Sequence, residues 1–242
     1  NYIIKKRNKS VVSLNWYNEY EQVKEYIDES EGMAYQLDED RTGFTMVPER
    51  NFENLKNFKK IIGKSDYKAR SGVEFTPAEI YFVEPIKDVF GTKDTFFFKN
   101  SSFENSIYKA KYKKMFELET KYIKPVIKGP CIKTFYIEDS NNYCIFPYKE
   151  GEKECVGISD LMKESPILAN YFIDNKSIIE KQSNRSRMIT MGNDFYALSK
   201  VGIYTFADYY VTFRDNTKLD AAVVKKVKSP WGEEIMPVCA KH

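Results

Sequence analysis

The sequence predicts an α+β protein with small mixed sheets and several helices. Stretches in which apolar residues recur every three or four positions alternate along the chain with short stretches rich in β-branched and aromatic residues. Segments containing glycine, proline and asparagine separate them. With 242 residues, of which 42% are hydrophobic, the chain is long enough and apolar enough to bury a core.

The N-terminal region is expected to combine strands with helices. Residues 2–12 have the pattern of a short strand, a charged turn and the start of a second strand. From about Leu14 to Gly32 a helix is predicted, because apolar residues recur at helical steps. These residues are Trp16, Tyr20, Val23 and Ile27. Residues 35–47 are typical of a hairpin, and residues 52–63 of a second helix.

The middle of the chain is predicted to be rich in strands. Residues 79–83 and 96–99 have strand composition. A helix is expected over residues 106–122, closed by Pro125. Residues 126–148 then alternate as strands do, with a hairpin turn at the sequence DSNN.

The last third is expected to begin with a helix and to continue as strands. Ser165 and Pro166 form a typical helix start, an N-cap serine followed by proline, and the helix is predicted to reach about residue 182. From Phe195 onward, apolar and polar residues alternate in strand fashion. A change of composition at residues 100–105 (NSSFEN) predicts two domains, residues 1–104 and residues 105–242.

Charge and cysteine content limit the cellular setting. The net charge of +3 is the difference between 38 basic and 35 acidic residues, so local clusters of lysine matter more than the total. Each cluster is also compatible with a simple solvated face. The four cysteines form no C-x-x-C pair, and no signal peptide or membrane-spanning apolar run is found. We therefore expect reduced thiols, a cytoplasmic location and no membrane contact.

The usual catalytic motifs are missing from the sequence. His242 is the only histidine and is the last residue, which excludes histidine-based catalytic pairs and histidine zinc sites. The glycines never form G-x-G, so no nucleotide-binding loop is expected. We expect no metal site, no cofactor and no catalysis in this chain alone, although acid–base chemistry between carboxylates remains compatible with the sequence.

A region rich in cations and aromatic rings follows the predicted helix. Arg185 and Arg187 lie in a Ser/Asn-rich turn, and Lys200 begins a run of aromatic residues that includes Tyr204 and Phe206. Arginine offers a planar fork of donors for guanine edges and phosphates, and aromatic rings offer stacking faces. This combination favours a surface that binds nucleic acid.

Several segments occur in an order that resembles a known family. They are YIKPVIKGPCI (122–132), NYCIFPYKEG (142–151), the helix and arginine turn at 165–187, FYAL (195–198) and the block KVGIYTFADYYVTFRD from Lys200. This order resembles the target-recognition domain of class I adenine-N6 DNA methyltransferases of restriction-modification systems, the Taq-type and type IIG-like enzymes. Residues 67–83 resemble the link that follows the catalytic domain in these enzymes.

The chain also departs from that family. Pro130 and Cys131 stand where the family often has Arg-Asp, and the catalytic and cofactor motifs are absent. The sequence begins with Asn1. We therefore expect a fragment whose methyltransferase domain, with its S-adenosylmethionine, lies N-terminal to it, so that residues 1–104 are a linker or accessory region and residues 105–242 the recognition domain.

The resemblance implies that the chain recognises double-stranded DNA for a site-specific adenine-N6 methyltransferase. Arg185, Arg187 and Lys200 are the candidates for base-edge or backbone contacts, and Tyr204 and Phe206 for stacking or wedging. The candidates for phosphate contacts are Lys124, Lys128 and Lys133, together with Lys68 and Arg70 just before Gly72.

Other interpretations remain open. For Tyr204 and Phe206 the pattern favours the core face of a sheet over stacking on a base. The many tyrosines also suit a protein-interaction or assembly module without DNA specificity.

Overall fold

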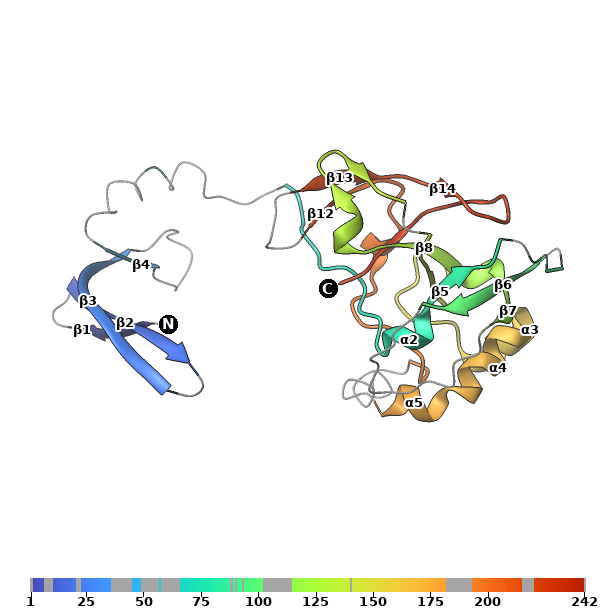
Figure 1. The fold of residues 1–242 in the computed structure, drawn as a ribbon, viewed down its shortest axis with the longest axis horizontal. Helices are drawn as coiled ribbons and strands as arrows, with labels where there is room; N and C mark the ends of the chain where they lie inside the picture. Colours follow the sequence, from blue (N-terminus) through green and yellow to red (C-terminus); the bar gives the residue numbers. More distant parts are fainter. Residues whose placement is uncertain are drawn as a thin grey trace. The chain divides into compact units, whose positions relative to one another are not determined.

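The computed structural model divides the chain into two compact units, Asn1–Ala69 (unit 1) and Arg70–His242 (unit 2) (Figure 1). The chain contains both helices and strands in several small sheets, so the predicted α+β class is confirmed. The structure describes residues 2–6, 11–20, 23–35, 45–48, 57, 66–87, 89, 91–92, 94–101, 115–139, 141–181, 193–214 and 220–241.

Unit 1 contains a four-stranded antiparallel sheet in the order β1-β2-β3-β4. Its strands are β1 (Tyr2–Lys6), β2 (Val11–Tyr20), β3 (Val23–Tyr35) and β4 (Thr45–Pro48). The two strands predicted within residues 2–12 are confirmed by β1 and β2, and the charged turn between them lies outside the described residues. The antiparallel pairing of β3 with β4 agrees with the hairpin predicted at residues 35–47.

The helix predicted from Leu14 onward is wrong. Its residues lie in β2 and β3, which pair directly at Tyr20 and Val23. A spacing of four positions fits a strand, with its period of two, as well as a helix, and the step of three spans the connection between the strands. The helix predicted at 52–63 lies outside the described residues, except Asn57, which is helical.

Unit 2 is built on a six-stranded sheet in the order β16-β8-β11-β5-β6-β7. Its strands are β5 (Phe82–Pro85), β6 (Thr95–Asn100), β7 (Phe116–Glu119), β8 (Ile123–Ile127), β11 (Tyr143–Ile145) and β16 (Val238–Cys239). Neighbouring strands are antiparallel except for β16, which runs parallel to β8. The C-terminal segment therefore forms one edge of the sheet.

The boundary between the two units differs from the domain boundary that the composition change predicted. β5 and β6 pair with β11 and β7 in a single sheet, so residues 70–104 belong to unit 2. The change of composition at residues 100–105 begins at the last residue of β6, which pairs with β7, whereas the division falls between Ala69 and Arg70.

Short helices and hairpins complete unit 2. The helices are α2 (Ala78–Tyr81), α3 (Ile158–Glu164), α4 (Pro166–Asp174) and α5 (Lys176–Glu180), with 3-10 turns η2 (Thr120–Tyr122), η3 (Gly129–Cys131) and η4 (Ile203–Phe206). The hairpins are β9 (Ile132–Lys133) with β10 (Tyr136–Ile137), β12 (Tyr210–Phe213) with β13 (Ala221–Val224), and β14 (Val227–Lys228) with β15 (Glu234–Ile235).

Several local predictions change accordingly. The helix start at Pro166 is confirmed, but α4 ends at Asp174 and α5 follows. In the region predicted as a helix at 106–122, the described residues 116–119 form β7 and residues 120–122 form η2. The region predicted as a strand at 79–83 begins as the helical turn α2. No described helix is long and apolar enough to cross a membrane.

An aromatic core joins the helices of unit 2 to the sheet. Phe172 of α4 stacks on Tyr196 with ring centroids 4.3 Å apart. The segments IFPY (145–148) and FYAL (195–198) are both buried. They are linked where the backbone N–H of Leu198 donates to the phenolic oxygen of Tyr148 at 2.6 Å. These motifs therefore form the scaffold that carries the segment beginning at Ser199.

Candidate nucleic-acid interface

The segment from Lys200 to Phe206 forms a tight, internally bonded turn that ends in η4. Lys200 has a left-handed backbone with φ of 64°. The Tyr204 hydroxyl donates to the Lys200 carbonyl oxygen at 2.5 Å. The Gly202 N–H donates to Thr205 Oγ1 at 3.2 Å, and the Thr205 N–H donates to the Gly202 carbonyl at 2.9 Å. The Tyr204 ring and the backbone of the turn are therefore held by hydrogen bonds within the turn itself.

Arg70 lies against one of these rings. Its guanidinium carbon is 5.9 Å from the centroid of the Tyr204 ring. The segment that follows Arg70 is anchored on both sides, because the Val73 N–H donates to the Cys239 carbonyl at 2.8 Å and the Glu74 N–H donates to the Ser199 carbonyl at 3.0 Å. Residues far apart in the sequence thus meet beside η4.

Glu74 connects two lysines in the same place. Its carboxylate is 3.0 Å from Lys241 Nζ and 3.9 Å from Lys200 Nζ. The side-chain contact with Lys241 lowers the pKa of Lys200, as expected when a second ammonium group lies beside it. The single carboxylate of Glu74 therefore lies beside two ammonium groups, so these three side chains together carry a net positive charge.

Lys124 of β8 approaches the second ring of the turn. Its ammonium nitrogen lies 5.4 Å from the Phe206 centroid and 5.3 Å from the Phe146 centroid. Burial lowers the pKa of Lys124. Among the described residues no carboxylate forms an ion pair with it. A half-buried ammonium between two aromatic faces is an attractive site for an anionic group such as phosphate.

These contacts define the η4 cluster: Arg70, Glu74, Lys124, Lys200, Tyr204, Phe206 and Lys241. It brings together five of the residues that the sequence singled out, namely Arg70, Lys124, Lys200, Tyr204 and Phe206. Sequence reasoning missed Glu74 and Lys241, which are separated by 167 positions. Ion pairs across such a separation leave no local pattern.

The other predicted residues lie elsewhere. Lys128 has its ammonium 4.1 Å from the centroid of the Phe82 ring and donates to Asn142 Oδ1 at 3.4 Å. Lys133, on the β9–β10 hairpin, pairs with Glu138 at 3.2 Å. Lys68 is exposed and belongs to unit 1. Arg185 and Arg187 lie outside the described residues.

The two aromatic residues of the turn differ in environment. Phe206 is half-buried, and its ring packs 5.9 Å from that of Phe146 in the core. Tyr204 is 41% exposed. Neither residue lies in the strand that the alternating pattern predicted, because residues 203–206 form a 3-10 turn. Phe206 therefore anchors the turn to the core, and Tyr204 faces the surface.

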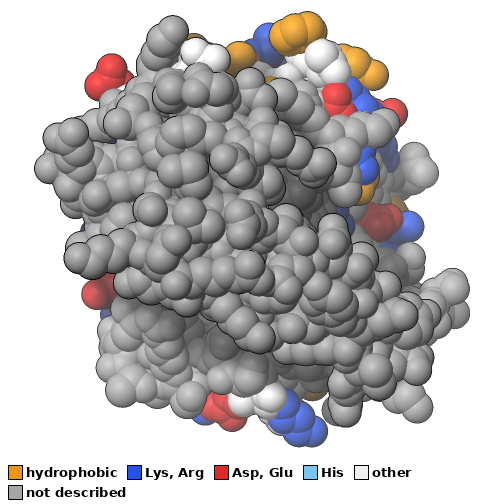
Figure 2. All heavy atoms as spheres, turned by 90° about the vertical axis from the view of Figure 1, so that its left-hand side faces the viewer, with side chains coloured by type: hydrophobic (Ala, Val, Ile, Leu, Met, Phe, Trp, Pro, Cys, Tyr) orange, Lys and Arg blue, Asp and Glu red, His pale blue; other side chains and the backbone are white. Residues whose placement is uncertain are grey.

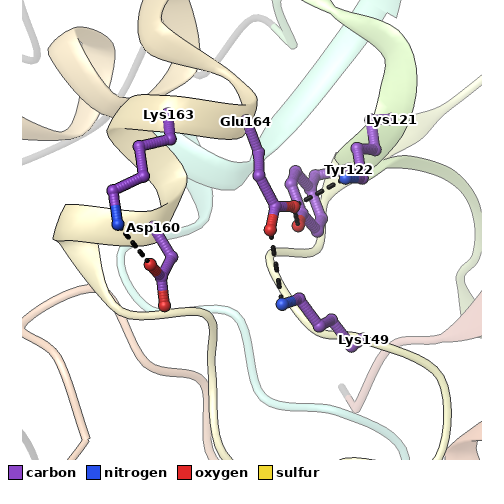
Figure 3. A network of polar contacts seen from close by, with 6 residues as sticks. All are labelled: Lys121, Tyr122, Lys149, Asp160, Lys163 and Glu164. Carbon is purple, nitrogen blue, oxygen red and sulfur yellow. Dashed lines mark hydrogen bonds and ion pairs between the residues drawn. The ribbon is translucent and has the colours of Figure 1, made fainter.

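A second polar network joins α3 to the sheet (Figure 3). The Glu164 carboxylate accepts hydrogen bonds from Lys121 Nζ and from the Tyr122 hydroxyl, both at 2.6 Å, and lies 3.3 Å from Lys149 Nζ. The hydrogen bonds from Lys121 and Tyr122 lower the pKa of Glu164 to about 2. Every group in the network has a partner within it, which is typical of a structural tie rather than of a catalytic site.

The β12–β13 hairpin presents an apolar outer face. Val211, Phe213 and Val223 are 65%, 53% and 63% exposed, and Val211 lies directly opposite Val223. Phe135, whose N–H donates to the Ala221 carbonyl at 2.8 Å, is 90% exposed and has φ of 69°. Figure 2 shows exposed hydrophobic side chains beside Lys and Arg side chains at its upper edge. Exposed apolar groups of this kind are common in binding surfaces.

The four cysteines are partly or fully buried, and none of them forms a disulfide. Cys144 is fully buried in β11, and burial raises its pKa. Within the described part of the chain, no group of three or more His, Cys, Asp or Glu residues is placed to hold a metal ion.

Comparison with known proteins assigns no family. No protein-family model matches the chain, and no curated protein matches it.

Proposed function

We propose that this chain is the sequence-specific DNA-recognition part of an S-adenosylmethionine-dependent adenine-N6 DNA methyltransferase of a restriction-modification system. In this proposal the chain acts in the cytoplasm on double-stranded DNA. The methyl donor is bound by a methyltransferase domain outside this chain, which extracts the target adenine from the duplex. Unit 2 is the recognition domain.

The η4 cluster is the observation that carries the proposal. Arg70 and Lys124 contact the two aromatic rings of the turn, Lys200 begins the turn, and Lys241 shares the carboxylate of Glu74 with Lys200. Lysine and arginine contacts to phosphates supply most of the affinity of a protein for a duplex and fix its register. A guanidinium at such a surface can also reach base edges.

The salt dependence of duplex binding tests this proposal. If Lys124, Lys200 and Lys241 each neutralise one phosphate, they contribute about −3 to the slope of log Kobs against log salt concentration. Fluorescence anisotropy with a labelled duplex, measured over a salt series, gives this slope. We expect Lys124→Gln to reduce the magnitude of the slope by about 1.

The matched control is Lys163→Gln. Lys163 lies on α3, where it pairs with Asp160 at 3.2 Å, and it is not a member of the η4 cluster. This variant removes the same charge and should leave the slope unchanged. Equal effects of Lys124→Gln and Lys163→Gln would show that binding depends only on total charge, which would contradict a defined DNA site.

Arg185 and Arg187 are tested in the same assay. Arg185→Ala and Arg187→Ala are each expected to weaken duplex binding, since either guanidinium can donate to a phosphate or to a base edge. Unchanged affinity in both variants would remove these residues from the proposed site and leave the η4 cluster as its centre.

A protein-interaction or assembly module is the second candidate function. The apolar face formed by Val211, Phe213 and Val223 favours it, because exposed aromatic and aliphatic groups are typical of protein interfaces. Sedimentation of the wild-type chain and of Phe213→Ser tests self-association. Two results together would favour this function over DNA recognition. The first is a complex that forms only when Phe213 is present, and the second is a wild-type affinity for the duplex no greater than that of Lys124→Gln.

A further inference from the structure

We propose that Arg70 is a specificity-determining residue that reads a base edge, and that Tyr204 is the positioning residue that holds it in place. This assignment rests on the proposed function. It gives the Tyr204 ring a role other than stacking on a base, since the guanidinium carbon of Arg70 lies over the ring, 5.9 Å from its centroid. A planar guanidinium held on an aromatic face keeps a fixed orientation, which a flexible lysine does not.

The Tyr204 ring is itself held on two sides. Its hydroxyl donates to the Lys200 carbonyl oxygen at 2.5 Å. The ring also lies over Gly202, where an added Cβ would be 2.5 Å from ring atom Cε1. Only glycine leaves room for the ring in this position. The glycine of the turn therefore sets where the ring lies, and the ring sets where Arg70 lies.

The backbone that carries Arg70 is equally constrained. A Cβ at Gly72 would be 2.6 Å from the Cys239 carbonyl oxygen, so the segment after Arg70 passes directly against the C-terminal backbone. Hydrogen bonds from Val73 to Cys239 and from Lys241 to Val73, both 2.8 Å, hold it there. Both ends of the Arg70–Tyr204 contact therefore start from fixed backbone.

The surrounding charges match a duplex. Lys200 and Lys241 share Glu74, and Lys200 belongs to the same turn as Tyr204, whose ring Arg70 contacts. Phosphate contacts by these lysines would fix the register of the DNA, and the guanidinium fork would then donate two hydrogen bonds to one guanine. Guanine is the base of choice because its O6 and N7 atoms are two adjacent acceptors.

The test is a comparison of sequence preference and total affinity in the whole chain. The duplex that wild type prefers is first selected from a pool of random sequences. Affinities are then measured for this duplex and for duplexes in which each base pair is replaced in turn. We expect Arg70→Lys to keep the salt slope of wild type but to lose about 5- to 150-fold of discrimination at one guanine position.

Variants of the turn separate positioning from contact. Gly202→Ala, whose methyl group displaces the ring, should lose preference at the same guanine although it removes no side chain that contacts DNA. Tyr204→Phe keeps the ring and should retain most of the preference, whereas Tyr204→Leu should lose it. Lys163→Gln is the control, and thermal unfolding of each variant verifies that it is folded.

The outcomes distinguish this assignment from the proposed function. If Arg70→Lys leaves the preference at every base pair unchanged, Arg70 does not read a base edge and the assignment is wrong, while DNA recognition stands. Full preference in both Gly202→Ala and Tyr204→Leu would show that the ring does not position Arg70. If wild type selects no sequence and binds duplexes without salt dependence, the proposed function fails and this assignment fails with it.

Discussion

Glu119, rather than Ser165, caps helix α4. The backbone N–H groups of Ile167 and Leu168 donate to Glu119 Oε1 and Oε2, both at 2.9 Å. Ser165 occupies the N-cap position, but its side chain makes no capping hydrogen bond, and its buried Oγ has no partner among the described residues. A carboxylate from the end of β7 therefore satisfies the first N–H groups of the helix and complements its dipole.

Replacing the residue at an N-cap position usually destabilises a protein, but here we expect the larger loss when Glu119 is replaced. Glu119→Ala should lower the free energy of unfolding by about 0.5–2 kcal/mol, the usual cost of losing a cap. Ser165→Ala should change it little, because it removes a hydroxyl that lacks a partner. Urea unfolding followed by circular dichroism measures both. A larger loss in Ser165→Ala than in Glu119→Ala would contradict the observed cap.

Glu164 makes folding stability depend on pH. Its pKa in the folded protein is about 2, below the ordinary value of 4.5, because it accepts hydrogen bonds from Lys121 and Tyr122. A carboxyl group with a lowered folded pKa stabilises the fold fully above its unfolded pKa, and this contribution is lost as pH falls from about 4.5 toward 2.

The matched experiment uses Glu164→Gln. At pH 7 this variant should unfold at a lower temperature than wild type, and the difference should shrink as pH falls toward 2. Thermal unfolding at a series of pH values measures it. A difference that stays constant over the whole range would show that the stabilisation does not come from the ionised carboxylate.

At the residue scale, the sequence predicted what is encoded locally. Lys200, Tyr204 and Phe206 were identified because cations interleaved with aromatic residues form a visible pattern. The ion pairs of Glu74 with Lys200 and Lys241 were not predicted, because they form only where three segments of the chain meet in space. Likewise, Ser165 has the residue type of a cap, but a distant glutamate performs that role.

At the element scale, period alone did not distinguish strand from helix. Trp16 and Tyr20 lie four positions apart in β2, as do Val23 and Ile27 in β3. A spacing of four is compatible with both periodicities, so the pattern of a hairpin resembled that of one helix. The β-branched and aromatic composition of these residues was the signal that favoured strands.

Gly72 is predicted to be essential for the pairing of Val73 with the C-terminal segment. A methyl group at this position would lie 2.6 Å from the Cys239 oxygen, so Gly72→Ala must push the two backbones apart. We expect a loss of about 1–3 kcal/mol in the free energy of unfolding, as for overpacking elsewhere. Chemical denaturation measures this loss.

Gly157→Ala is the control for that experiment. A Cβ at Gly157 meets no atom within 4 Å, and its φ of −65° is accessible to alanine. Its effect should stay within about 0.5 kcal/mol. If both substitutions have the same small effect, the close approach at Gly72 does not constrain the fold.

At the scale of the whole molecule, unit 2 contains its own core. The buried aromatic and aliphatic residues of its main cluster extend from Val73 to Val238. We therefore predict that a fragment of residues 70–242 folds alone and unfolds in one cooperative transition, with a midpoint close to that of the same transition in the full chain. Calorimetry tests this, and a fragment without a cooperative transition would contradict it.

The fold class was predictable, but the topology was not. Alternating helix-like and strand-like segments predicted the α+β class, and the alternation of apolar and polar residues agrees with strand β12. The order β16-β8-β11-β5-β6-β7 places the last strand against one from the middle of the chain. Such pairing depends on which apolar faces fit together, and no local pattern encodes it. The composition change at residues 100–105 consequently fell within a sheet.

Hydrogen–deuterium exchange in the presence of a duplex tests most directly whether the η4 cluster is a DNA-binding surface. The full chain is compared with and without a duplex that it binds, at low salt. We predict slower exchange at residues 70–74 and 199–206, where the cluster and its backbone lie. Slower exchange confined to residues 210–213 and 221–224 of the β12–β13 hairpin, or none in unit 2, would contradict the account.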